Sequence, residues 1–432
     1  MQMTWDWEIG EKELTDITKW TFDYKWIGES QFSQDGEKVA NVACLDEGEF
    51  SIGINGNLWS NIFDSIWNPR FSPDGRFTCL VSSMGMWTMA VDDRPWEEEY
   101  EYIWETQFSH NGQTIAAAIK KDGQYAIAKN GKSWPNFFPH ATDFIMSIDG
   151  VKTACVVQKQ SLDEGDIDTF LQGIYTLAVD GQAWEQTFLN VWDPCFDHEG
   201  KNIAATIRLA KKEYSLAING QPWSQTFDCA WKPCFDPIEK NVYAPVEKNS
   251  KWGLAKNGEL HWDHRFAQLW GVQTSKDGQH LAAIVAPKYG QFTVAMDKKT
   301  WSTTYPVLTD MIISPDGNNI AALGQSGTAL SESGYKLEYP KWQVIVNNQP
   351  WIDWYDNAFK PIFSLDSQHV AVKVEKRGKY TMALDGKIFP QEFSELWDPI
   401  FNPESDKVLI KALDGHTFKR IVAPLKSFSG NP

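Results

Sequence analysis

Short runs of aromatic and β-branched residues alternate with turn sequences along the whole chain. Between residues 59 and 96, WSNIFDSIWNPRFSPDGRFTCLVSSMGMWTMAVDDRPW, four such runs are separated by Asp-Gly, Ser-Met-Gly and Asp-Asp. Aromatic and β-branched side chains suit a pleated, half-buried surface. Asp-Gly suits a tight hairpin, because glycine accepts the positive φ that the turn needs. The pattern therefore predicts four antiparallel strands.

This unit repeats ten times. Each copy carries a phrase similar to FSPDG, and successive copies are mostly about 38 residues apart. The phrases lie at 32–36, 71–75, 108–112, 146–150, 196–200, 235–239, 273–278, 313–317, 363–367 and 401–405. A repeat of this length is typical of β-propeller blades, which bury their apolar faces only against their neighbours. The sequence therefore predicts an all-β propeller of about ten four-stranded blades.

Tryptophan recurs at two fixed positions of the unit. One position follows an Asn-Gly or Asp-Gly turn after the third run, and the other lies in the first run of the next unit. The first holds Trp59, Trp96, Trp134, Trp184, Trp223, Trp262, Trp301 and Trp351, with Phe389 in one copy; the second holds Trp67, Trp104, Trp192, Trp231, Trp270 and Trp397. A ligand site would gather its indoles in one or two places. We therefore expect these side chains to pack between consecutive blades.

Both ends of the chain fall inside a repeat. Residues 20–32, WTFDYKWIGESQF, are similar to a fourth strand followed by the first strand of the next blade, and HTFKRIVAP at 416–424 stands where a third strand belongs. The N-terminal strand around Trp20 is therefore predicted to complete the last blade and close one ring, which removes an open sheet edge. Two rings are the alternative. This interpretation divides the chain into an N-terminal extension at 1–19, the propeller at 20–424 and a C-terminal tail at 425–432.

Composition adds the charge of the protein. The chain has 57 Asp and Glu against 40 Lys and Arg, a net charge of −17, which disfavours nucleic acid as a partner. No stretch approaches the 18 apolar residues of a membrane span, and the N-terminal sequence MQMTWDWEIGEKE lacks the apolar core of a signal peptide. We expect a cytoplasmic protein without a membrane span of its own.

The search for catalytic and metal-binding motifs finds none. The six cysteines include Cys79 and Cys155 in second strands, Cys229, and Cys195 and Cys234 at equivalent places of two units, without CxxC or CxxCH spacing. A GxSxG elbow is absent, the histidines are scattered over turns and edges, and the Asp of WDP alternates with Asn and Lys. We therefore predict buried, unreactive cysteines, no catalytic, cofactor-binding or metal-binding residues, no cofactor, and a protein that is not itself an enzyme.

Two insertions give the best functional signal. They lie at 158–172 and 324–340, each between the second and third strands of its blade. Such loops share one face of a propeller with the connections between blades, whereas the tight hairpins lie on the other face. Lengthened loops on a rigid framework are common binding elements, so we expect a docking surface on this face. Neutral surface insertions are the alternative.

The FSPDG phrase resembles the WD40-like repeat of TolB-type propellers over all ten units, although the G-H and terminal W-D marks of WD40 repeats are absent. Together with 22 Trp, the acidic charge and the missing signal peptide, it makes the chain similar to the tryptophan-rich (TmcD-like) subunits of the Tmc transmembrane electron-transfer complexes of sulfate-reducing bacteria. This resemblance implies a cofactor-free accessory subunit whose partners are a membrane cytochrome b, a CCG-domain iron–sulfur protein and a multihaem cytochrome c. It carries no site residues.

The sequence thus leads to the hypothesis of a non-catalytic scaffold that organises redox partner subunits through one propeller face, peripherally associated with a membrane through them. Two alternatives stay open. One is a propeller hydrolase acting on peptides or glycans, which needs acidic or Ser and His groups at the channel mouth. The other is a free-standing TolB-like binding protein, which would purify without redox partners.

Overall fold

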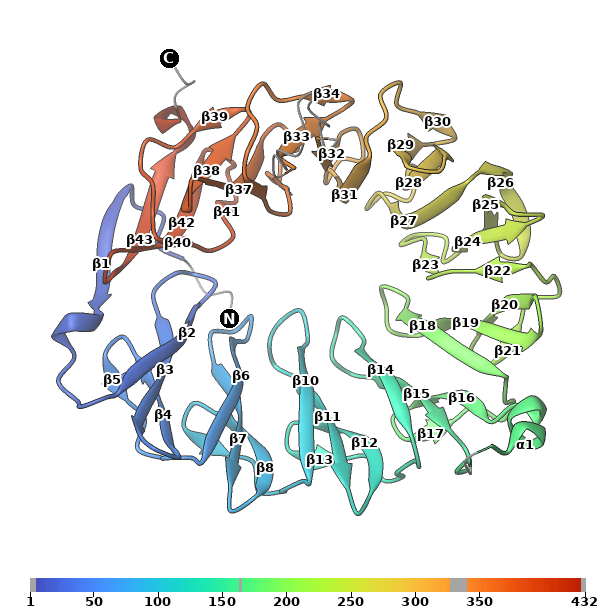
Figure 1. Cartoon of the computed structure of the whole chain (residues 1–432), viewed down its shortest axis with the longest axis horizontal. Coiled ribbons are helices and arrows are strands. Elements are labelled where there is room, and N and C mark those ends of the chain that lie inside the picture. Colours follow the sequence, from blue (N-terminus) through green and yellow to red (C-terminus); the bar gives the residue numbers. More distant parts are fainter. Residues whose placement is uncertain (1–4, 163–164, 327–339, 429–432) are drawn as a thin grey trace, which may run out of the picture.

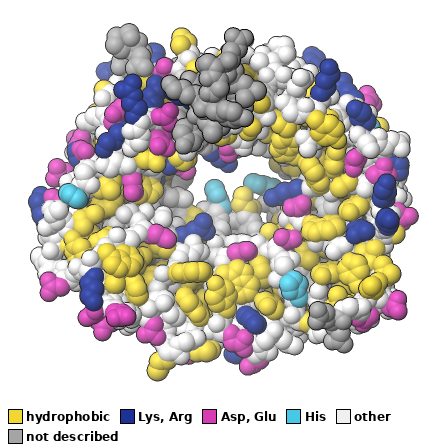
Figure 2. Space-filling model, viewed as in Figure 1, with side chains coloured by type: hydrophobic (Ala, Val, Ile, Leu, Met, Phe, Trp, Pro, Cys, Tyr) yellow, Lys and Arg dark blue, Asp and Glu magenta, His cyan; other side chains and the backbone are white. Residues whose placement is uncertain are grey.

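A computed structural model describes residues 5–162, 165–326 and 340–428. Ten antiparallel sheets follow one another along the chain and form a single ring with an open centre (Figure 1, Figure 2). The first strand of each sheet lies nearest the centre. In three sheets this first strand is split into two short pieces. The prediction of an all-β propeller with ten four-stranded blades is confirmed.

The blades are numbered in chain order, and each consists of a first to a fourth strand. The first strands are β2 (Trp26–Phe32), β6 (Ser65–Phe71), β10 (Tyr102–Phe108), β14 (Ala141–Met146), β18 (Asn190–Phe196), β22 with β23 (Cys229–Ala230, Cys234–Phe235), β27 (Gln268–Thr274), β31 (Val307–Ile313), β35 with β36 (Asn357–Ala358, Ile362–Phe363) and β40 with β41 (Glu395–Leu396, Ile400–Phe401). The second strands are β3 (Val39–Asp46), β7 (Phe77–Ser83), β11 (Ile115–Lys121), β15 (Thr153–Gln158), β19 (Ile203–Ala210), β24 (Val242–Lys248), β28 (Leu281–Lys288), β32 (Ile320–Gln325), β37 (Val370–Lys376) and β42 (Lys407–Asp414).

The third strands are β4 (Glu49–Ile54), β8 (Met86–Val91), β12 (Gln124–Lys129), β16 (Tyr175–Val179), β20 (Glu213–Ile218), β25 (Lys251–Lys256), β29 (Gln291–Met296), β33 (Trp342–Val346), β38 (Lys379–Leu384) and β43 (Thr417–Pro424). The fourth strands are β5 (Asn57–Leu58), β9 (Arg94–Pro95), β13 (Lys132–Ser133), β17 (Gln182–Ala183), β21 (Gln221–Pro222), β26 (Glu259–Phe266), β30 (Lys299–Thr300), β34 (Gln349–Pro350), β39 (Lys387–Ile388) and, for blade 10, β1 (Gly10–Asp16).

The first turn of each blade explains the FSPDG phrase. In blade 4, Ser147 Oγ accepts the N–H of Lys152 at 2.9 Å and donates to the Asp149 carboxylate at 2.6 Å. Asp149 also accepts the N–H of Val151 at 3.0 Å, and these hydrogen bonds lower the pKa of its carboxyl group. Matching contacts recur in most other blades. The Ser and Asp of the phrase are therefore turn residues.

The turn between the third and fourth strands requires Asn or Asp. Asn130 has φ of 48°, its side-chain oxygen accepts the N–H of Ile115 at 2.8 Å, and its own N–H donates to the Ile115 carbonyl at 2.8 Å. The same side-chain contact occurs in nine blades. Only an acceptor that tolerates the left-handed region serves here, which explains why Asn and Asp alternate.

Consecutive blades touch through glycines of these turns. A Cβ on Gly112 would lie 2.4 Å from the backbone nitrogen of Asp74 in the preceding blade. A Cβ on Gly131 would lie 3.3 Å from Trp96 Cγ, and Gly220 meets Trp184 in the same way. The prediction that tryptophans pack between blades is confirmed for the first of the two repeated positions.

At the second position the prediction holds for two tryptophans: Trp104 lies 5.5 Å from Phe144 of the next blade, and Trp397 lies 4.7 Å from Phe32 of blade 1, between ring centroids. The other four, Trp67, Trp192, Trp231 and Trp270, pack on aromatic rings of their own blade instead. Trp231 packs on Trp252 of its own blade with ring centroids 4.3 Å apart, and Trp270 packs on Phe292 at 5.2 Å. Trp67 is 57% exposed. Most of these indoles lie within the first strand of their blade, close to the connection from the preceding blade.

The ring closes as expected, but through an earlier segment. β1 pairs antiparallel with β43, from Gly10 opposite Val422 to Asp16 opposite Thr417. The predicted strand around Trp20 is therefore wrong, and part of the expected N-terminal extension belongs to blade 10. Trp20 follows a short 3-10 helix at Ile17–Lys19 and lies 3.1 Å from the Cβ position of Gly56 in blade 1. Within the expected C-terminal tail, Leu425–Ser427 form another 3-10 helix; residues 429–432 lie outside the described part.

The seam, meaning the interface of blade 10 with blade 1, is charged where the other blades are apolar. Buried Arg420 forms an ion pair with Glu37 at 2.9 Å and donates from Nε to the Asp35 carbonyl at 2.9 Å. Its cross-strand partner Lys411 is also buried, and burial lowers the pKa of that amine to about 8. The third-strand position of Arg420 is buried and apolar elsewhere: Ile52, Met89, Ile127, Leu177, Leu216, Leu254, Val294, Val344 and Met382.

The connections divide the ring into two faces. The turn face carries the first-to-second and third-to-fourth turns; the loop face carries the second-to-third loops and the connections between blades. The insertion at 158–172 lies on the loop face and contains α1 (Ile167–Gln172), capped by the side chain of Asp166. Of the insertion at 324–340, residues 327–339 lie outside the described part. None of the helices in the described ranges has the length and apolar character of a membrane crossing.

Candidate binding surfaces

The wall of the central channel is shaped by a repeated bulge in the first strands. Strand pairing is interrupted after Trp67, Trp104, Thr142, Trp192, Trp270 and Thr309. The residue that follows each of them has φ between 49° and 63°. Bulges re-aim side chains, and left-handed φ favours short polar residues or glycine. This explains why Asn, Asp or Gly occupies five of the six bulge positions, with Glu105 as the exception. The sequence showed this pattern only as the alternation of WDP and WNP.

Three of these bulge residues form an acidic arc across blades 3 to 5. Burial and the neighbouring Asp143 raise the pKa of Glu105. Burial and Asp193 raise the pKa of Asp143, while the N–H of Asp193 and the Lys232 amine oppose the rise. The causes of these shifts place the carboxylates within electrostatic reach of one another around the channel. In blade 6 the arc ends at Lys232.

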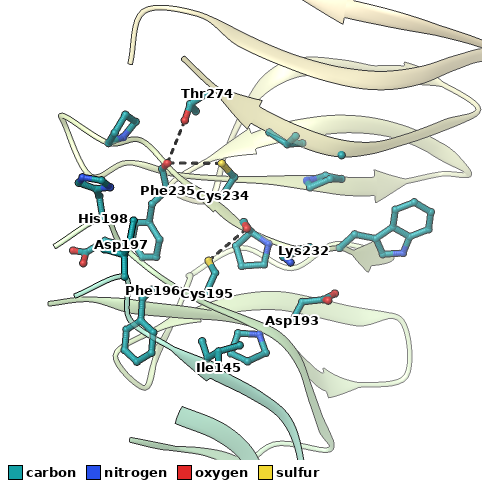
Figure 3. A pocket seen from close by; sticks show the side chains of 18 of the residues that line it. Ile145, Asp193, Cys195, Phe196, Asp197, His198, Lys232, Cys234, Phe235 and Thr274 are labelled. Carbon is teal, nitrogen blue, oxygen red and sulfur yellow. Dashed lines mark hydrogen bonds between the residues drawn. The ribbon is translucent and has the colours of Figure 1, made fainter. Parts of the chain in front are cut away.

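A cavity of about 1000 Å³ lies on the channel wall beside this arc. The first strands of blades 4 to 7 line it, and Figure 3 shows Cys195, Phe196, Cys234 and Phe235 on neighbouring strands, with His198 toward one end and Asp193 toward the other. Its lining is mainly apolar, with Lys232 among the charged groups. The sequence did not predict this cavity, because its walls come from four blades and none of these blades contains a binding motif of its own.

The cysteines of the cavity are chemically quiet. Cys195 Sγ donates to the Pro233 carbonyl at 3.4 Å, and burial raises the pKa of its thiol to about 12. Burial also raises the pKa of Cys234. All six cysteines are free thiols. Cys44, Cys79 and Cys155 are buried as predicted, whereas Cys195, Cys229 and Cys234 are only partly buried. A thiol with a raised pKa is a poor nucleophile and a poor metal ligand at neutral pH, because both roles need the thiolate.

Histidines serve mainly as turn residues. His280 Nδ1 lies 2.8 Å from an Asp297 carboxylate oxygen, and His369 Nδ1 lies 2.7 Å from Asp385. Both aspartates belong to turns between third and fourth strands, where they also accept backbone N–H groups. Within the described ranges, no serine hydroxyl is hydrogen-bonded to a histidine ring, and no group of three or more His, Cys, Asp or Glu is placed to hold a metal.

The loop face carries most of the exposed apolar side chains. Of eighteen large hydrophobic side chains exposed in the described part, twelve lie on this face: Trp26, Ile62, Trp67, Met84, Met86, Tyr102, Ile167, Leu171, Tyr289, Val307, Ile352 and Trp354. Five lie on the turn face: Ile148, Val151, Ile238, Leu260 and Leu365. Hydrophobic patches with charged side chains between them surround the ring in Figure 2. Exposed apolar patches of this kind mark interaction sites.

One group of these side chains, the Trp-Met patch, lies on blades 2 and 3. We define it as the exposed Trp67, Met84, Met86 and Tyr102 together with the half-buried Trp87 and Trp104. Its rings form a continuous row: Trp67 to Trp87 at 6.3 Å, Trp87 to Tyr102 at 6.0 Å and Tyr102 to Trp104 at 5.5 Å between centroids. Met84 lies in the loop between β7 and β8, and Met86 is the first residue of β8 in the same blade. The repeated second tryptophan was the sequence signal for the patch, but its exposure was not predicted.

Acidic side chains, called the acidic rim, lie on both sides of the Trp-Met patch along the chain. We define the rim as Glu47, Glu49, Asp64, Glu99, Glu101 and Asp122, all exposed at the loop-face ends of blades 1 to 3. Glu101 forms a long ion pair with Lys120 at 3.8 Å, and Lys121 lies beside Asp122 in the same loop. Lys25 lies near Glu49 but forms an ion pair with a further carboxylate, Asp46. The carboxylates therefore still outnumber the lysines and leave the rim negative.

Comparison with known proteins yields similarities of fold alone. The sequence matches no family model, and no curated protein sequence resembles it significantly. Among solved structures, it is similar to a eukaryotic initiation factor (TM-score 0.47, 14% identity, 81% of this chain and 94% of that chain). It is also similar to the propeller domain of the Trilobed protease from Pyrococcus furiosus (0.31, 14%, 65% and 97%) and to TolB from Acinetobacter baumannii (0.28, 14%, 58% and 60%). These likenesses carry no information on function.

Proposed function

We propose that this chain is a non-catalytic scaffold whose loop face holds partner proteins. The uneven distribution of exposed apolar side chains between the two faces carries this proposal. Side chains such as Ile352, 96% exposed, and Trp354 add nothing to the core of the blades and expose apolar surface to water. A partner that covers them would regain the hydrophobic free energy that the free chain forgoes.

We further propose that the partners are subunits of a membrane-associated electron-transfer complex. This finer proposal is supported by the sequence resemblance to tryptophan-rich Tmc subunits, which implies a membrane cytochrome b, a CCG-domain iron–sulfur protein and a multihaem cytochrome c as companions. In this arrangement electrons pass through the cofactors of the partners, and the chain associates with the membrane peripherally through them.

A second candidate is a free-standing binding protein, and the cavity on the channel wall favours it. A mainly apolar hollow of about 1000 Å³ with a few charged groups, such as Asp193 and Lys232, has the general character of a ligand site. A protein that works in this way would be isolated alone and would not depend on its loop face.

Affinity purification of the full chain from mildly solubilised membranes separates these proposals. Recovery of haem and iron–sulfur signals in fixed ratio to the chain is the expected result. Isolation of the chain with partner proteins that carry no redox centre would contradict the electron-transfer proposal. Isolation of the chain with no protein partner at all would contradict the scaffold proposal.

A pair of matched variants assigns the partners to one face. Ile352→Ser with Trp354→Ser changes exposed residues of the loop face, whereas Ile238→Ser with Leu365→Ser changes exposed residues of the turn face. We expect only the first pair to reduce partner recovery, while both keep the melting temperature of the parent because exposed side chains contribute little to stability. An equal loss from both pairs would contradict docking on the loop face.

A further inference from the structure

The Trp-Met patch contains a feature that folding does not explain. Met84 occupies the first position of a two-residue turn with φ of 49°, and its side chain is 96% exposed. The left-handed region favours Asn, Asp and Gly, and an exposed thioether gains nothing from the fold. At the matching place in the loops of blades 1, 3 and 9 the chain has the charged residues Glu47, Asp122 and Arg377, and in blade 7 it has the exposed Tyr289. An apolar side chain is therefore held outward in blade 2 at a cost to the free chain.

The backbone holds Met84 in this position. The Met84 N–H donates to the Asp64 carboxylate at 2.7 Å, and Gly85 follows with φ of 81°. The methionine therefore projects from a fixed turn, although its own side chain is flexible. At the loop-face end of the same two blades, Trp67 is 57% exposed, and Met86 and Tyr102 are each 37% exposed. A rigid aromatic row with adaptable methionines at its edge is a surface that can accept the apolar side of a helix.

The rim determines the charge of the occupant. Glu47 and Glu49 lie on the blade 1 side of the patch, and Glu99, Glu101 and Asp122 lie on the blade 3 side. Lys120 reaches Glu101 only at 3.8 Å. Carboxylates on both sides of an apolar surface attract a partner whose apolar stripe is flanked by lysine or arginine, and repel one flanked by acids. The same negative charge disfavours anionic lipid headgroups.

We propose that the Trp-Met patch binds a basic amphipathic helix of a partner protein. This inference rests on the scaffold proposed above and names the partner chemistry of one part of its loop face. The apolar stripe of the helix lies on Trp67, Met84 and Tyr102, and its basic side chains meet the acidic rim. Burial of these side chains supplies affinity, and the rim supplies selectivity and a fast encounter.

Two model peptides test the proposal on the full chain. One is a helix of leucine and lysine about 18 residues long, with one apolar stripe; the other has glutamate in place of every lysine. Fluorescence anisotropy of the labelled peptides measures affinity. We expect the lysine peptide to bind at least about tenfold more tightly than the glutamate peptide, and this preference to shrink as salt screens the rim.

Matched variants place the binding. Met84→Ser with Trp67→Ser should weaken the lysine peptide at least about tenfold. Ile238→Ser, a change at a 62% exposed residue on the turn face, should leave its affinity unchanged. Both proteins should retain the melting temperature of the parent, because the replaced side chains are exposed.

The remaining outcomes overturn the proposal. Equal affinity for the two peptides, or unchanged binding by the patch variant, would show that no basic helix is selected there. Flotation of the chain with neutral phosphatidylcholine vesicles, lost in the patch variant, would identify the patch as a lipid-contacting surface. The patch variant could bind both peptides as tightly as the parent does, while the parent chain is still purified together with redox subunits. In that case the proposed helix-binding site is wrong and the scaffold proposal stands.

Discussion

The charged seam predicts that Arg420→Met loosens the closure of the ring. Methionine keeps most of the apolar volume of arginine and matches Met89 and Met382 at the equivalent place in other blades. The substitution removes the ion pair with Glu37 and the hydrogen bond to the Asp35 carbonyl. It therefore tests the charge while preserving the packing.

The magnitude follows from the burial of the groups. Breaking a buried ion pair by removing one partner costs about 3–5 kcal/mol, because the other charge is left desolvated. Glu37 keeps 30% of its side chain exposed and retains an ion pair with Lys12, so we take the lower end, about 3 kcal/mol. Lys411, the buried neighbour of Arg420, offsets part of this loss, since a like charge is removed from beside it.

Native-state hydrogen exchange measures this effect locally. If the seam opens as a unit, a loss of about 3 kcal/mol accelerates exchange of the amides that pair β1 with β43 by about a hundredfold. Arg94→Met, at an exposed arginine in blade 2, is the control and should leave exchange there unchanged. Exchange in β1 that is unchanged or slower in Arg420→Met would refute the reasoning, because the charged cluster would then contribute nothing to closure.

Three further predictions concern stability. Burial lowers the pKa of Lys411 in the folded chain to about 8 from an ordinary value of 10.5. Between these two pH values the unfolded chain binds one more proton than the folded chain, so the free energy of unfolding rises with pH across that window. Denaturant titrations should show this rise, at most about 3 kcal/mol, in the parent and not in Lys411→Met; the same slope in both would contradict it. Gly112→Ala should lower the free energy of unfolding by about 3 kcal/mol, because the added Cβ meets the backbone of the neighbouring turn. Gly123→Ala is the control: this glycine has the same φ of 74° but open space around it, so the loss should be only about 1 kcal/mol. Equal losses would refute the close blade contact. Asn130→Ala should lose about 2 kcal/mol in a thermal melt through the unsatisfied N–H of Ile115, and Asn130→Asp should lose much less; similar losses would remove the proposed role of the side-chain acceptor.

Local chemistry made the blades readable from the sequence. Ser147 and Asp149 bond to backbone groups within five residues, so the FSPDG phrase identifies its turn wherever it occurs. Asn130 bonds to a residue at the start of the same hairpin, which fixes another turn. Because each blade repeats these contacts, the number of blades and their strand order followed from the spacing alone. The face expected to dock partners followed from the same topology.

Contacts between distant parts of the chain were decided only by the tertiary structure. The sequence of β1, with alternating charges, does not reveal that it pairs with β43, and Arg420 resembles any strand residue until Glu37 of the first blade lies against it. Likewise Trp67 and Trp96 recur with equal regularity, yet one is exposed and the other meets a glycine of the next blade. Periodicity fixes which residues share a place in the blade. What lies against that place depends on neighbours brought close by the curvature and closure of the ring, and one repeat carries no information about them.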